Sequence, residues 1–344
     1  MPFSELTGQD RAVGALRSAL TRGNLHHAYL FGGPEGVGKA TAARLLAQAA
    51  NCDRGPGDAC GACATCHKIA RGVHPDVIVL SEERVMAKAG RWEPRGGRTP
   101  SSDIVVDQIR DLVDHRLAMK RFEARRRFVI IDPADAMNAQ AQNALLKTLE
   151  EPPDDTTVIL VTSSPDALLA TIRSRCARLA FGALPDATII ARLVAAGVDG
   201  EAARLAAALA GGSLGRALGL DEEALSAREG AVRAAAELDP GDASSWLAFA
   251  REHGDDREEA RATCELLTLW LRDVLAFQAA GAAAPLALAD LAPYTHRLAA
   301  AVRPDDVLGR IDQTRSAAAA LRQNAQPTLA LERMLIGWFD GELR

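Results

Sequence analysis

The sequence predicts an α/β domain built on a parallel sheet, followed by a region that contains only helices. Up to Phe181, apolar and mostly β-branched runs alternate with helical patterns, as expected for strands buried on both faces of a sheet. A glycine-rich loop comes directly after the first run and opens a helix. After Phe181 no strand pattern remains, and Ala and Leu dominate. The predicted strands comprise residues 28–31, 76–80, 127–132 and 157–162.

Length and composition restrict the class of protein. The chain has 344 residues, more than one ordinary core holds, so two or three domains are expected. Hydrophobic residues make up 48% and charged residues 25%, which is typical of globular proteins, and the net charge of −5 argues against a protein that wraps duplex DNA. No apolar run is long enough to span a membrane, and the first residues lack a signal-peptide pattern. We therefore expect a cytoplasmic protein with reduced thiols.

Two helical patterns lie between the later strands. One covers residues 103–119, and the other covers residues 138–151, beginning at Asn138, a good N-cap residue, and ending before Pro152. Residues 81–102 show no apolar period and are rich in Gly, Pro and charge, so they are expected to form a mobile loop.

The remainder of the chain is predicted to be helical. Residues 185–197 and 199–212 each have the pattern of a short helix closed by glycine, and the chain beyond them is helical throughout. We therefore predict an α/β domain over residues 1–181, a small helical domain over residues 182–212 and a helical C-terminal domain over residues 213–344.

The glycine-rich loop has the pattern of a phosphate-binding loop, G-x-x-x-x-G-K, and lies between a strand and a helix as that loop requires. Its glycines allow backbone N–H groups to curl around phosphate, and the helix N-terminus adds a positive end. Lys39 would reach the outer phosphates. The alternative is a tight glycine turn with an exposed lysine. The predicted nucleotide-binding residues are Gly33, Gly36, Gly38, Lys39 and, after a later strand, Asp132.

Two positions that ATP hydrolysis needs have lost their chemistry. Ala40 stands where a hydroxyl normally holds Mg²⁺, and Thr41, one residue later, lies about 100° further round the helix. Asp132 ends a strand, where a metal-holding carboxylate belongs, but the next residue is Pro133 in place of an acid that polarises water. We predict that the chain does not hydrolyse ATP, while binding of ATP or ADP stays open.

Four cysteines follow the helix of the loop with C-x7-C-x2-C-x2-C spacing, in a module of residues 52–66. Four thiolates at this density in a reduced compartment suit tetrahedral Zn²⁺, and four protein ligands leave no open position, so the site is expected to be structural. An iron–sulfur cluster and disulfide pairing are the alternatives. The predicted ligands are Cys52, Cys60, Cys63 and Cys66, whereas Cys176 and Cys264 are isolated and expected to be ordinary core or surface thiols.

Several motifs together resemble the clamp loader subunits of bacterial DNA polymerase III, which are members of the AAA+ superfamily. They are "HHAYLFGGPEGVGK", the four-cysteine module, "NALLKTLEEPP" over residues 143–153 and "SRC" over residues 174–176. The resemblance covers about residues 3–215 by motif and the rest by helical character. It implies a RecA-like AAA+ P-loop domain with a zinc module, a small helical lid domain and an all-helical C-terminal collar domain.

Two types of subunit share these motifs. The gamma/tau type is the ATPase motor and carries an intact loop threonine and an acid after the strand-end Asp. The delta-prime type has the same build but a degraded ATP site, and Ala40 and Pro133 make this chain resemble that type. A gamma/tau-type motor is the alternative function, and a nucleotide-binding scaffold in DNA repair is a third.

The resemblance implies roles for two arginines. The arginine of "SRC", Arg175, would reach a neighbouring subunit's ATP as an arginine finger supplied in trans. Motor subunits place a nucleotide-sensing arginine at the position that Gly215 occupies here, so a sensing role for Arg216 is not assigned. The basic run Lys120, Arg121 and 125–127 is expected to be a solvated edge, although it could meet phosphates.

The implied function is that of a non-motor subunit that assists ATP-dependent loading of the sliding clamp onto primed DNA. The implied partners are the gamma/tau and delta subunits, with the clamp and primed DNA engaged through the complex, and no membrane is involved.

Overall fold

The computed structural model describes residues 3, 6–55, 57–220, 222–323 and 325–339, with backbone alone for residues 222–226. They form two compact units, Met1–Ile189 with Gly212–Gly215, and Ile190–Gly211 with Arg216–Arg344. The domain boundaries predicted at residues 181 and 212 stay predictions. In the described part of the chain, no helix is both long and apolar enough to cross a membrane.

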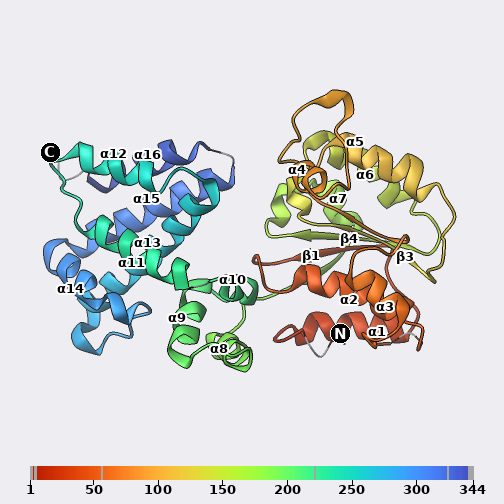
Figure 1. Cartoon of the computed structure of the whole chain (residues 1–344), viewed down its shortest axis with the longest axis horizontal. Coiled ribbons are helices and arrows are strands. Elements are labelled where there is room, and N and C mark those ends of the chain that lie inside the picture. The colour runs from red at the N-terminus through yellow and green to blue at the C-terminus, as the bar shows by residue number, and fades with distance from the viewer. Residues whose placement is uncertain (1–2, 4–5, 56, 221, 324, 340–344) are drawn as a thin grey trace. The chain divides into compact units, whose positions relative to one another are not determined.

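A five-stranded parallel sheet forms the centre of the first unit (Figure 1). All four predicted strands are present, and the strand order is β2-β3-β4-β1-β5. β1 pairs with β4 on one side and with β5 on the other, while β3 lies between β2 and β4. The strands are β1 (Ala28–Gly32), β2 (Val77–Leu80), β3 (Arg127–Ile131), β4 (Thr156–Thr162) and β5 (Ala177–Ala180).

The two faces of the sheet carry two separate cores, because successive strand residues point to opposite faces. Tyr29 and Phe31 of β1 pack on the face that α2 covers, whereas Leu30 packs on the face that α6 covers. The sequence runs therefore lack polar positions because both faces are buried. The helices of this unit are α1 (Asp10–Thr21), α2 (Lys39–Asn51), α3 (Ala64–Ala70), α4 (Glu83–Lys88), α5 (Val106–Asp111), α6 (Ala139–Glu150) and α7 (Ala170–Arg175).

Both helices predicted between the later strands are present, but only the second is a regular α-helix throughout. The Asn138 side chain accepts a 2.9 Å hydrogen bond from Ala141 N and caps α6, which confirms the predicted N-cap. The other pattern is interrupted: α5 passes into a π-helical turn over Leu112–Leu117.

The prediction of a mobile loop over residues 81–102 is wrong for its first part, because α4 begins at Glu83 and a 3₁₀ turn covers Arg95–Gly97. The fully buried carboxylate of Glu83 accepts hydrogen bonds from several residues of this excursion, the segment of residues 81–102. Arg98 donates two hydrogen bonds to it at 2.6 Å, Trp92 Nε1 donates one at 3.0 Å and Ser101 N one at 2.8 Å. Composition alone did not reveal these contacts, since each partner is polar and far along the chain.

The second unit is built from helices around one apolar core. Trp270 of α13 is fully buried, and Arg310 of α15 lies over the Phe339 ring with 4.9 Å between guanidinium carbon and ring centre. The helices from residue 186 onward are α8 (Asp186–Ala195), α9 (Gly200–Ala210), α10 (Leu214–Leu218), α11 (Glu222–Ala236), α12 (Ala243–Glu252), α13 (Arg257–Ala280), α14 (Ala292–Ala301), α15 (Pro304–Arg322) and α16 (Pro327–Phe339). No strand occurs among the described residues after β5, as predicted.

Glu83→Ala should destabilise the first unit by about 2 kcal/mol, because it removes the acceptor of four hydrogen bonds, two of them from a charged donor. Burial alone would raise the pKa of Glu83, but hydrogen bonds from Arg98, Ser101 and Trp92 outweigh it and lower the pKa below the ordinary 4.5. The stabilisation is therefore complete above pH 4.5 and is lost as the pH falls through the lower folded value. Urea denaturation followed by tryptophan fluorescence measures the effect.

The matched control is Glu93→Ala, ten residues further along the same excursion, whose side chain is exposed and makes no hydrogen bond or ion pair among the described residues. Equal unfolding free energies for the two variants would show that Glu83 does not hold the excursion.

Candidate nucleotide and metal sites

The predicted phosphate loop connects β1 to α2 and has the conformation that its glycines permit. Gly36 and Gly38 have φ of 70° and 100°, in the left-handed region that favours glycine. A Cβ on Gly33 would lie 2.1 Å from the backbone oxygen of Phe181, so a side chain does not fit there. The loop therefore keeps the shape of a phosphate cradle at the N-terminus of α2.

Lys39 is the first residue of α2 and is buried, with 6% exposed. Its Nζ donates to the backbone oxygens of Gly33 at 2.7 Å and Pro34 at 2.5 Å, so the lysine closes the loop on itself. Burial lowers the pKa of Lys39, while Asp132, Asp135 and Glu35 counteract this effect. The alternative of an exposed lysine on a glycine turn is wrong.

Asp132 lies beside Lys39, as the motif predicts, because β3 and β1 end at the same edge of the sheet. Its N–H donates to Leu80 O at 2.9 Å, and burial raises the pKa of its carboxyl group while Arg44 and Lys39 lower it. The structure thus brings together the predicted lysine and carboxylate.

The neighbouring positions lack the groups that hydrolysis uses. Ala40 presents a methyl group, and Pro133 follows Asp132 through a cis peptide bond. Asp135, which the sequence analysis did not single out, also influences the pKa of Lys39. Its buried Oδ1 has no hydrogen-bond partner among the described residues. The sequence feature that could have pointed to Asp135 is its position three residues after Asp132, the carboxylate at the end of the strand.

Gly215 contacts the phosphate loop through its backbone. Gly215 N donates to Gly36 O at 2.9 Å, and a Cβ on Gly215 would lie 3.2 Å from Gly36 Cα. Arg216, the next residue, forms an ion pair with Glu265 of α13. This ion pair therefore joins the side chain of Arg216 to another helix of the second unit.

Arg175 is the last residue of α7, and its side chain is 34% exposed. Its Nη2 donates to Glu150 Oε1 at 2.6 Å and its Nη1 to Thr171 O at 2.9 Å. It makes no hydrogen bond or ion pair with Lys39 or Asp132 among the described residues. Arg173, two residues earlier, forms an ion pair with Asp166. Ala177, two residues after Arg175, pairs with Tyr29 near the start of β1, whereas the phosphate loop follows the end of that strand, so Arg175 lies at the other end of β1 from the loop.

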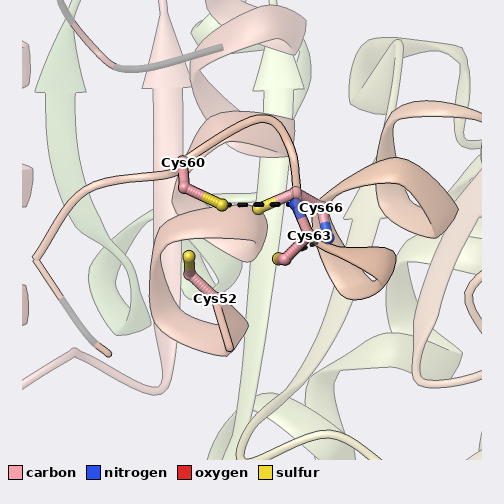
Figure 2. A group of neighbouring side chains, drawn as sticks. All are labelled: Cys52, Cys60, Cys63 and Cys66. Atoms are coloured by element: carbon pink, nitrogen blue, oxygen red, sulfur yellow. Dashed lines mark hydrogen bonds between the residues drawn. The ribbon is translucent and has the colours of Figure 1, made fainter. Parts of the chain in front are cut away.

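The four predicted metal ligands gather at the other end of α2 (Figure 2). Cys52 follows α2, Cys63 caps α3 and Cys66 lies in α3. All four Sγ atoms lie within 4.8 Å of one another, and a tetrahedral zinc with bonds of about 2.3 Å needs about 3.8 Å between sulfurs. All are free thiols, so the disulfide alternative finds no support.

Backbone donors prepare the cluster for thiolates. Ala62 N and Cys63 N donate to Cys60 Sγ at 3.5 and 3.3 Å and lower the pKa of Cys60 to about 6, the Ala62 bond most strongly. Burial raises the pKa of Cys66 to about 12. The donor set fits a metal that binds thiolate. The isolated Cys176 and Cys264 are both buried, as core thiols.

The predicted solvated edge at residues 120–127 is only partly solvated. Lys120 and Arg121 are exposed, but Arg127 is 4% exposed and donates to Leu117 O and Met119 O. Arg126 Nε donates to Thr157 Oγ1 at 2.7 Å. The prediction is wrong for these two arginines, because they serve as donors for backbone and strand groups at the start of β3.

Several known proteins have sequences similar to this chain. DNA polymerase III subunit delta' of Pseudomonas aeruginosa is 42% identical over 45% of this chain and 42% of its own length. Subunit delta' of Bacillus subtilis is 36% identical over 58% of this chain and 55% of its own length. Subunit tau of Escherichia coli is 35% identical over 67% of this chain and 34% of its own length. The chain thus matches about a third to just over half of the length of these relatives.

The family described as "DNA polymerase III, delta subunit" matches residues 8–185. These 178 residues, counted from 8 to 185, are more than half of the 344. This chain therefore belongs to that family of DNA polymerase III clamp loader subunits, within the AAA+ superfamily.

Proposed function

We propose that this chain is a non-motor, delta-prime-type subunit of a cytoplasmic clamp loader. It assists ATP-dependent loading of the sliding clamp onto primed DNA, together with gamma/tau and delta subunits. The observation that carries this proposal is a phosphate loop that retains its shape but lacks a hydroxyl at Ala40 and an acid at Pro133. ATP or ADP can be accommodated by such a loop without being hydrolysed, with Gly33, Gly36, Gly38, Lys39 and Asp132 as the binding residues.

The useful chemistry of the subunit is assigned to Arg175. Its guanidinium is partly exposed at the end of α7 and is held by a surface ion pair, which is worth only about 0.2–1 kcal/mol. A neighbour's triphosphate can outcompete such a pair, because arginine meets phosphate oxygens in pairs. Arg175 then acts as a finger in trans, neutralising the charge that develops during phosphoryl transfer.

The second candidate function is a gamma/tau-type motor. The observation that favours it is the Asp135 carboxylate beside Lys39, whose Oδ1 has no partner among the described residues and could take over part of the missing acid function. The tau subunit among the relatives is compatible with this candidate.

The helical unit is assigned to assembly into the collar. Leu329 and Ile336, seven residues apart on α16, are 62% and 54% exposed and share one face of that helix. Leu308 on α15 is 50% exposed. Apolar residues at helical spacing suit a helix-to-helix contact with another subunit.

The chain alone should not hydrolyse ATP, because neither Ala40 nor Pro133 offers a group for metal or water. A coupled-enzyme assay on the purified chain tests this, with Lys39→Ala as control. Steady turnover near 1 s⁻¹, about the low end of ordinary enzymes, that disappears in Lys39→Ala would contradict the non-motor assignment. If Asp135→Asn also removed it, the second candidate would be favoured.

The purified chain should contain one zinc ion, held by Cys52, Cys60, Cys63 and Cys66 in a closed structural site. Replacing Cys63 by Ser should remove the metal and loosen the module, because four thiolates act as one unit. Metal analysis of the folded chain measures this, with Cys264→Ser as a control outside the cluster. Finding iron, or a folded protein without metal, would refute the zinc site.

Arg175→Ala should leave the subunit folded and assembled but lower DNA-stimulated ATP hydrolysis and clamp loading by the complex. A finger in trans contributes roughly 10³–10⁵-fold at one site, and the remaining sites limit the loss for the whole assembly to about two- to tenfold. Reconstituted complexes and steady-state kinetics provide the measurement.

The matched control is Arg178→Ala, three residues further on, where the side chain is exposed and forms no ion pair among the described residues. A complex with Arg175→Ala that loads clamps as fast as the control would refute the role in trans.

A further inference from the structure

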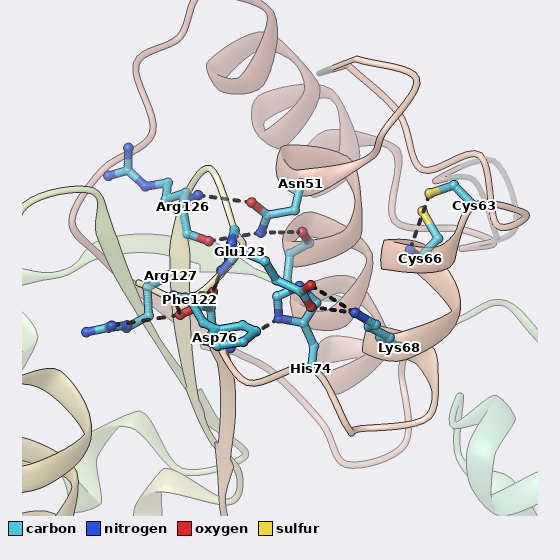
Figure 3. A network of polar contacts seen from close by, with 12 residues as sticks. Asn51, Cys63, Cys66, Lys68, His74, Asp76, Phe122, Glu123, Arg126 and Arg127 are labelled. Carbon is cyan, nitrogen blue, oxygen red and sulfur yellow. Dashed lines mark hydrogen bonds and ion pairs between the residues drawn. The ribbon is translucent and has the colours of Figure 1, made fainter. Parts of the chain in front are cut away.

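The segment of residues 122–126, just before β3, takes part in a network of hydrogen bonds although most of it lies at the surface (Figure 3). The buried carboxylate of Asp76 accepts hydrogen bonds from the backbone N–H groups of residues 122, 123 and 124, at 2.8–3.1 Å. Asn51, at the end of α2, accepts from Arg126 N at 3.0 Å and donates to Arg126 O at 2.9 Å. The backbone N–H groups of residues 122, 123, 124 and 126 thus each have an identified acceptor.

The cysteine module adds two further contacts to the same segment. Arg125 Nη2 donates to the backbone oxygen of Cys52 at 2.9 Å. Lys68, on α3 two residues after Cys66, donates to both carboxylate oxygens of Glu123 at 2.8 and 2.9 Å. The first contact therefore involves Cys52, the first cysteine of the module, and the second involves Lys68 on α3, the helix that carries Cys66.

We propose that the metal-loaded cysteine module fixes the conformation of the 122–126 segment through Arg125 and Lys68. The proposal rests on the proposed metal site and gives the module a role beyond its own stability. A bound metal would hold Cys52 and α3 in fixed relation, so that the carbonyl oxygen and the ammonium group reach the segment together. Without that relation, the two contacts would have to be made one at a time, each against the freedom of a long side chain.

The consequence is a metal-dependent surface at the edge of the sheet opposite the phosphate loop. Phe122 is 82% exposed and Met119 is 65% exposed, next to the exposed Lys120. The backbone that carries this exposed aromatic ring is held by the contacts described above. Loss of the metal would let that backbone move while the sheet stays intact.

Hydrogen exchange tests the proposal, because the amides of Phe122, Glu123, Ala124 and Arg126 are the groups that the contacts protect. In the full-length chain, removing zinc with a chelator should raise exchange across residues 122–126 by about tenfold, within the usual range of coupling between sites. Peptides from β4 should be unchanged and report that the sheet is folded.

Arg125→Ala keeps all four cysteines and separates the contact from metal binding. It should raise exchange of the same amides in the zinc-loaded chain. Because coupling between two sites is reciprocal, it should also weaken zinc binding, measured by competition with a chromogenic chelator. The matched control is Arg71→Ala, next to α3, whose exposed side chain makes no hydrogen bond or ion pair among the described residues.

The outcomes separate the two proposals. If the folded chain binds no metal, the zinc site itself fails. If zinc binds but Arg125→Ala changes neither exchange nor zinc affinity relative to Arg71→Ala, the module does not position the segment. If chelation unfolds the whole unit, amide exchange and zinc affinity of Arg125→Ala still decide whether the module positions the segment.

Discussion

The parallel direction of five strands is the constraint on which the first unit depends. Because β1 and β3 run the same way on either side of β4, the loop after β1 and Asp132 after β3 meet at one edge of the sheet. The helix that starts in that loop then returns along the sheet, and its end carries Cys52 to the opposite edge, where Arg125 and Arg126 precede β3. One topology thus sets both the phosphate loop and the cysteine module.

The phosphate loop keeps its shape although Ala40 and Pro133 carry neither a hydroxyl nor an acid. The loop is stabilised by hydrogen bonds from Lys39 to two backbone oxygens and from Gly215 to Gly36, and none of these bonds involves the side chain at position 40. Having Ala at position 40 and Pro at position 133 leaves out the hydroxyl and the acid without disturbing the packing of the loop. A subunit whose task is to complete a neighbour's site can tolerate such changes, provided that Arg175 and the assembly surface stay in place.

Buried strands, the capped helix α6 and the cysteine cluster were predictable from the sequence, because each has a short local pattern with one physical cause. β5 was not predicted, since it is an edge strand whose residues alternate between partly buried and exposed and form no apolar run. The role of Glu83 was missed because its partners Trp92, Arg98 and Ser101 are polar residues in a segment without period. The ion pair of Arg175 with Glu150 joins two helices, and the inward contacts of Arg126 and Arg127 depend on tertiary packing, which no spacing encodes.

The central claim is that Arg175 of this chain supplies positive charge to the ATP site of a neighbouring subunit, whereas the phosphate loop of this chain lacks groups for hydrolysis. The most direct measurement mixes the chain with a gamma/tau-type motor whose own "SRC" arginine is replaced by alanine, and follows one turnover of ATP on primed DNA. The account predicts that hydrolysis rises as this chain is added, saturates at a fixed stoichiometry, requires Arg175 and is indifferent to Lys39→Ala in this chain. Hydrolysis that does not rise, or that rises only when Lys39 is intact, would contradict it.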